Sequence, residues 1–237
     1  MGSSAPTLHI SPRGIRRVLV PIVLGLTLAT LVAQFLKYPL DTPRGYGLVP
    51  LFDGDAEDNI PTLYSSLALL ACAALLYWRG AVARQAAQRY ARHWMALAAI
   101  FLLAAIDEAV QLHELVNEQI ISSTGVSEAA VPWVAPAAVL VLALAVAYRE
   151  FVRHLAEPVR RRAILGGGIF VAGALGLELL EGASLAALEG ETGDFADGLV
   201  STVQEFCEML GVVFILEALV LQLSLDGDSI RLRFGEG

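Results

Sequence analysis

Apolar residues run in six long stretches along this chain, and polar residues gather in the segments between them. The stretches cover about residues 18–36, 60–78, 94–116, 131–148, 164–187 and 199–222. Each could cross the roughly 30 Å of hydrocarbon in a bilayer as an α-helix, which rises about 1.5 Å per residue. The pattern predicts an all-α fold, an integral membrane bundle of six transmembrane helices. We expect one transmembrane domain at 18–223, between a disordered tail at 1–17 and a short tail at 224–237.

Composition supports a membrane protein and excludes several other classes. The chain is 56% hydrophobic, with a mean hydropathy of +0.63, which is too apolar for a soluble domain. Its two cysteines, Cys72 and Cys207, both lie in apolar stretches, so they form neither a disulfide framework nor a cysteine metal motif. The net charge of −8 averages over two oppositely charged faces and does not indicate nucleic-acid binding.

The arginines predict how the bundle sits in the membrane. Fourteen of the sixteen basic residues fall in the two tails and in the second and fourth loops, which all lie on one side. Only Lys37 and Arg44 fall on the other side, where most of the loop acids lie. Basic loops mark the cytoplasmic side of a membrane protein. We therefore expect both termini to be cytoplasmic, in a bacterial cytoplasmic (inner) membrane, with the acidic loops facing out.

Six carboxylates interrupt the apolar stretches with no Lys or Arg beside them. They are Asp107, Glu108, Glu178, Glu181, Glu205 and Glu208. A carboxylate in hydrocarbon costs several kcal/mol unless it is paired, protonated or bound to a cation. The predicted topology places all six in the outer half of the membrane. Each of the two Glu-x-x-Glu pairs shares one helix face, so we expect a common site.

The number and type of oxygens in this cluster suit a hard divalent cation such as Ca²⁺, Mg²⁺ or Mn²⁺. Zinc and di-iron fit less well, because a di-iron bundle uses two Glu-x-x-His motifs. Here the one histidine at that depth, His113, has the wrong spacing from Glu108. Protons could take the place of a metal. The opposing interpretation is structural: protonated carboxyls can hydrogen-bond across helices as neutral glue.

Other polar residues are expected near the outer mouth of the same site. His113 and Glu114 follow the acids of 94–116, and Ser65 and Ser66 lie at a similar depth in 60–78. The loop before 60–78 reads DGDAEDN, and it resembles the start of an oxygen-rich calcium loop without the closing Glu of an EF-hand. Its candidate ligands are Asp53, Asp55, Glu57 and Asn59. Two other interpretations of this loop stay open: a solvated acidic linker, and a mouth that concentrates cations above the intramembrane acids.

Three strings carry a resemblance to a known group of proteins. FDGDAEDNIPTLYSS, IDEAVQLHE and VQEFCEMLG resemble uncharacterised bacterial polytopic membrane proteins with FDxDxExNxPT, DExxxxHE and ExxEMLG motifs. The resemblance covers most of residues 50–222 and implies the topology but no activity. A more distant comparison is with alkaline ceramidase-like membrane hydrolases, which have seven spans and a three-histidine zinc site. This chain has six apolar stretches and no HxxxH pair.

These patterns favour a cation- or proton-coupled membrane protein, such as a transporter, with an outward-facing acidic pocket. Two alternatives stay open: a metal-dependent enzyme acting on a lipid or other outer-leaflet substrate, and a structural scaffold. The bilayer is the one partner that the sequence indicates. The substrate and the oligomeric state are not predicted.

Overall fold

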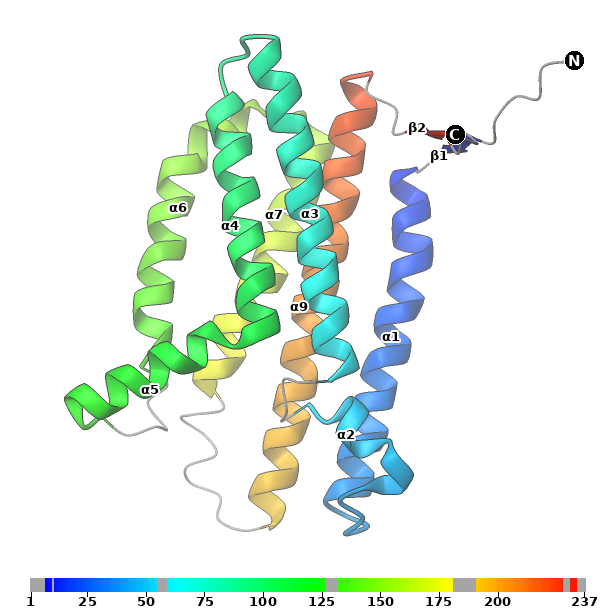
Figure 1. The fold of residues 1–237 in the computed structure, drawn as a ribbon, viewed down its shortest axis with the longest axis vertical. Coiled ribbons are helices and arrows are strands. Elements are labelled where there is room, and N and C mark those ends of the chain that lie inside the picture. Colours follow the sequence, from blue (N-terminus) through cyan, green and yellow to red (C-terminus); the bar gives the residue numbers. More distant parts are fainter. Residues whose placement is uncertain are drawn as a thin grey trace, which may run out of the picture.

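The computed structural model describes residues 7–9, 11–54, 59–126, 132–180, 191–227 and 231–233. In these residues the chain forms a bundle of six helices that are long and apolar enough to span a membrane (Figure 1). They are α1 (Pro12–Lys37), α3 (Ile60–Gln85), α4 (Ala91–Val110), α6 (Val134–His154), α7 (Glu157–Val171, continued by further helical turns to Leu180) and α9 (Glu191–Leu225). The prediction of a six-helix bundle is confirmed to this extent.

Short elements connect and close the bundle. A turn η1 (Gly45–Gly47) and a short helix α2 (Val49–Phe52) follow α1, and α5 (Leu112–Thr124) follows α4. Two short strands, β1 (Thr7–His9) and β2 (Arg231–Arg233), pair antiparallel. The pairing holds the two ends of the chain together at one end of the bundle (Figure 1).

Side-chain caps determine where two of the long helices begin. Ser11 precedes α1, and its hydroxyl accepts a hydrogen bond from the Gly14 amide at 3.0 Å. The carbonyl oxygen of the Asn59 side chain accepts from the Thr62 amide at 2.8 Å, at the start of α3. These bonds satisfy amides that have no partner within the helix. As a result α1 starts at Pro12, six residues before the predicted start of the first apolar stretch.

The helix α9 forms the centre of the bundle. It packs against α1, α3 and α7, and 61% of its most apolar window is buried. Small residues such as the glycines of 164–187 favour a central helix, because they let a neighbour approach closely, but only 11% of the corresponding window of Glu157–Leu180 is buried. The glycines do admit a neighbouring helix. A Cβ added at Gly166 would lie 2.7 Å from the Gly211 carbonyl oxygen of α9.

The stretch predicted as one helix at 94–116 is two helices. Gln111 adopts left-handed backbone angles (φ 57°, ψ 46°), so α4 ends at Val110 and α5 begins at Leu112. In Figure 1, α5 leaves the direction of the bundle and runs sideways at the end away from the termini. Asp107 and Glu114 are seven residues apart, which would place them on one face of a continuous helix, but the left-handed residue interrupts the helical repeat between them.

A π-helical stretch, η3 (Ala172–Leu177), continues α7 toward the same end. Gly173 lies within it, and a Cβ there would stand 2.9 Å from the Cβ of Cys207 and 3.0 Å from the carbonyl oxygen of Gln204. Such contact distances are closer than a side chain allows, so this glycine lets η3 pack directly on α9. The packing brings the next residue with a carboxyl group, Glu178, close to the acids of α9.

Candidate functional site: an acidic cavity

A cavity of about 590 Å³ lies among α3, α4, α6, η3 and α9, at the end of the bundle away from the termini. Eight carboxylates from four helical segments line it. They are Asp107 and Glu108 on α4, Glu114 on α5, Glu178 after η3, and Asp194, Asp197, Glu205 and Glu208 on α9. Among the described residues that line it, Lys37 and His113 are the basic side chains. The cavity is therefore strongly acidic.

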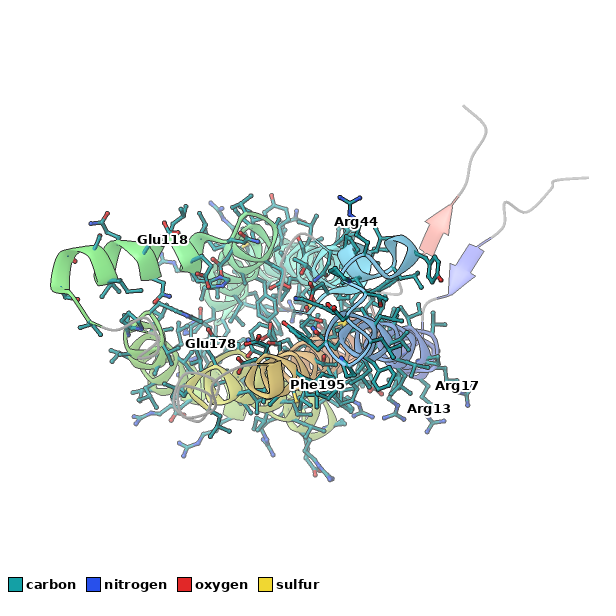
Figure 2. All side chains as sticks on the ribbon, turned by 90° about the horizontal axis from the view of Figure 1, so that it is seen from below. Arg13, Arg17, Arg44, Glu118, Glu178 and Phe195 are labelled. Carbon is teal, nitrogen blue, oxygen red and sulfur yellow. The ribbon has the colours of Figure 1, made fainter. Side chains whose placement is uncertain are left out.

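Five of the six carboxylates expected to form a common site line this one cavity. The sixth, Glu181, lies outside the described residues. Figure 2 looks from this end of the bundle, and there Glu178 lies inside the ring of helices, whereas Glu118 and Arg44 lie on its outside. The amide nitrogen of Gln204 donates a hydrogen bond to Glu178 Oε2 at 2.9 Å and so joins the end of η3 to α9.

A pair of one histidine and one carboxylate, His113 and Asp107, lies at the break between α4 and α5. The carboxylate of Asp107 accepts the backbone N–H of His113 at 2.8 Å, which caps the first turn of α5. Its second oxygen lies 3.3 Å from the Nδ1 of His113. The Nε2 of the same ring lies 3.7 Å from Glu114. Because Asp107 holds the ring at Nδ1, the Nε2 side is left toward Glu114, and all three residues line the cavity.

Residues on α9 form a polar stripe along the cavity. Asp194, Asp197, Ser201, Gln204 and Glu208 follow one another at intervals of three and four residues, and all line the cavity. That spacing places side chains on one helix face. The sequence prediction found only the end of this stripe, because it started the last helix near Leu199, whereas α9 begins at Glu191. Alternating steps of four and three residues backward from Glu208 would have found Asp197 and Asp194.

The described part of the acidic loop packs against the end of α1. Lys37 pairs with Asp53 at 2.8 Å, and the Gln34 side-chain amide lies 3.3 Å from the same carboxylate. The Asn59 side chain donates to the Asp53 carbonyl oxygen at 2.8 Å while it caps α3. Asp55 and Glu57 lie outside the described residues. Lys37 itself lines the cavity, which the sequence prediction missed.

Of the two serines expected at the outer mouth, Ser66 bonds to a neighbouring helix and Ser65 is buried. The Ser66 hydroxyl donates to the Ala105 carbonyl oxygen at 2.8 Å and ties α3 to α4. Ser65 is buried, and neither serine is among the residues that line the cavity. The wall of α3 is contributed instead by Thr62 and Leu69.

The described part of the chain does not contain a preorganised metal-binding site. Among those residues, no group of three or more His, Cys, Asp and Glu side chains is placed to hold a metal ion. The carboxylates surround a space of several hundred Å³ rather than converging on one point. A cation held by several of them would require the side chains to move inward.

A family model described as "Domain of unknown function (DUF8692)" matches residues 23–223. The chain belongs to DUF8692. The match includes the cavity and all three motif strings, and the family description states no activity. No curated protein and no solved structure matches the DUF8692 chain.

Proposed function

We propose that this protein is a cation- or proton-coupled membrane transporter whose acidic cavity is the coupling site. The observation that carries the proposal is the gathering of eight carboxylates around one cavity of about 590 Å³, with one lysine and one histidine. Charged carboxylates in a partly desolvated space repel one another. Protons or a cation that enter the cavity relieve that repulsion, so their binding is favoured.

The arginine pattern supports an orientation for this site. Fourteen basic residues lie at or near the end that carries both termini, and the cavity lies at the other end. With the basic side cytoplasmic, the cavity faces the outside of a bacterial inner membrane. The transmembrane domain is then 18–223, with cytoplasmic tails at 1–17 and 224–237. Eight acids line the cavity at this end, whereas Glu217 is the buried acid of the described residues toward the basic end. This distribution favours an outward-facing pocket over a continuous pore.

We assign the primary binding role to Glu178, Glu205 and Glu208, together with Asp107 and Glu108. Glu181 stays in this set as a prediction from its spacing to Glu178. His113 and Glu114 would act as a relay at the mouth, since His113 lies between two carboxylates. A divalent cation such as Ca²⁺, Mg²⁺ or Mn²⁺ would suit the oxygen ligands.

Proton or ion flux in proteoliposomes tests this proposal. Wild-type protein is expected to move protons or a tested cation in response to an imposed gradient, and Glu205→Gln and Glu208→Gln are expected to abolish the flux. The matched control is Glu118→Gln, because Glu118 is an exposed acid at the same end that does not line the cavity. Flux that persists in both cavity variants would refute the coupling role.

The Asp107–His113 pair favours a second candidate function, an enzyme acting on an outer-leaflet substrate. An imidazole oriented by a carboxylate is a common general base. Here the pair lies at the wall of a cavity large enough for a small substrate. If the chain is an enzyme, wild type should turn over a lipid from an extract and show no ion flux. His113→Gln should then abolish the turnover. If all Gln variants match wild type in every assay, a scaffold with carboxyls as neutral glue is favoured.

A further inference from the structure

A second hollow lies at the opposite, basic end of the bundle. It is a groove of about 710 Å³ bordered by α1 and α7, with α9 as its floor. Its lining combines arginines with apolar side chains, among them Arg16, Arg161, Arg162, Ile164, Leu165 and Phe214. None of these residues lines the acidic cavity, so the groove is a separate feature of the molecule.

The arginines of the groove are organised around one buried acid. Glu217 of α9 is fully buried, with Arg162 Nε 3.2 Å from one oxygen and Arg16 3.6 Å from the other. Arg161 pairs with Glu157 at 3.7 Å on the surface of α7. Three arginines therefore face two carboxylates, which leaves one positive charge in excess. Arg16 and Arg161 remain 48% and 78% exposed, so both can reach a further anion.

The apolar half of the groove begins directly below these charges. Ile164 and Leu165 follow Arg162 by two and three residues, or roughly 3–5 Å along the helix. They are 59% and 49% exposed, and neither is covered by another described part of the chain. Phe214 of α9 lies three residues before Glu217, on the same helix face, and forms the floor. The arginines of the groove thus lie at the level of the lipid headgroups, and its apolar side chains lie next to them at the level of the acyl chains.

We propose that this groove binds one anionic phospholipid. The phosphate would lie against Arg16 and Arg161, with Arg162 held behind them by Glu217. One acyl chain would lie along Ile164, Leu165 and Phe214. Basic pockets between transmembrane helices select acidic headgroups, and guanidinium groups bind phosphate with paired hydrogen bonds. A free phosphate ion would satisfy only the arginines, and a neutral lipid only the apolar wall, whereas an anionic phospholipid matches both halves.

Native mass spectrometry of the full chain in detergent tests the proposal. We add phosphatidylglycerol or phosphatidylcholine with identical acyl chains and compare how much lipid is retained. Wild type should retain phosphatidylglycerol at least about tenfold better than phosphatidylcholine. The double variant Arg16→Ala/Arg161→Ala should lose this preference. The double variant leaves the Arg162–Glu217 pair intact but removes the Arg16 contact to Glu217. The single variant Arg161→Ala leaves both partners of Glu217 in place, so it should weaken the preference at an unchanged melting temperature.

Two controls make the result decisive. Arg84→Ala/Arg92→Ala removes two exposed arginines at the same end that do not line the groove, and it should leave the preference unchanged. Soluble glycerol phosphate, which has the headgroup chemistry without acyl chains, should fail to displace the lipid. Equal retention of both lipids by wild type, an equal loss in the control variant, or displacement by glycerol phosphate would each overturn the proposal.

Discussion

The two ends of this bundle place acidic side chains in opposite surroundings. At the basic end, Glu217 is buried between Arg162 and Arg16, and Asp226 lies 2.6 Å from the buried guanidinium of Arg79. At the other end, eight carboxylates share a cavity with Lys37 and His113. The residue types are the same, but the counter-charges differ. Acids with matched arginines fix helices in place, whereas the excess of acids around the cavity is what the proposed exchange of protons or cations rests on.

Removing the buried acid at the basic end should have the largest effect on stability. Glu217→Gln would leave Arg162 and Arg16 facing a buried site without a counter-charge, which we expect to cost on the order of 3 kcal/mol. Thermal unfolding in detergent measures this. The exposed Glu150, which pairs with Arg153 on the surface, serves as a control, and Glu150→Gln should change stability by less than about 0.5 kcal/mol. If both variants lost the same stability, the buried acid with its arginine partners would contribute no more to folding than the exposed one.

Close packing next to the acidic cavity should come second in size. Gly173→Ala would drive a methyl group against Cys207 and Gln204 of α9, at an expected cost of about 1–3 kcal/mol. Gly176→Ala lies in the same π-helical stretch, where a Cβ would meet nothing within 4 Å. Unfolding curves of the two variants should therefore separate clearly. A harmless Gly173→Ala would mean that η3 and α9 can move apart.

The cap formed by Asp107 should contribute about 1 kcal/mol. Asp107→Ala removes the acceptor for the His113 amide, while Asp107→Asn keeps an oxygen there. Hydrogen exchange of the first α5 amides is expected to speed up in the alanine variant and to change little in the asparagine variant. Equally fast exchange in both variants would indicate that the negative charge of Asp107, rather than its acceptor oxygen, holds α5.

Loss of one cavity acid should have the smallest effect on stability, and of the opposite sign to that of Glu217. Glu208→Gln removes one charge from a cavity where carboxylates outnumber cations, so the melting temperature should stay constant or rise slightly. Calorimetry alongside Glu118→Gln measures the difference. A marked loss of stability in Glu208→Gln would indicate that the cavity acids stabilise the fold, as the acids of the basic end do.

Six helices could be predicted from the sequence because each apolar stretch exceeds the length needed to cross a bilayer. Five of the cavity acids could also be predicted, since helical spacing and the arginine pattern place them at one level. The break at Gln111 could not, because the residue has no strong preference for left-handed angles and the cap by Asp107 depends on three-dimensional proximity. Neither could Lys37, since its place at the cavity depends on how α1 packs against α9.

The π-helical stretch η3 has a consequence for how the cavity could be lost. Each residue of an α-helix turns the chain by about 100°. A π-helical turn has hydrogen bonds between residues five apart instead of four, so it holds about one residue more than an α-helical turn. If Ala172–Leu177 wound as an ordinary α-helix with the same residues, Glu178 would rotate by about 100° around the helix axis and point away from Gln204. Deleting one residue at the same time would restore its direction, because the wide turn absorbs one extra residue. A change of winding here, with no acid replaced, would therefore take a carboxylate out of the cavity.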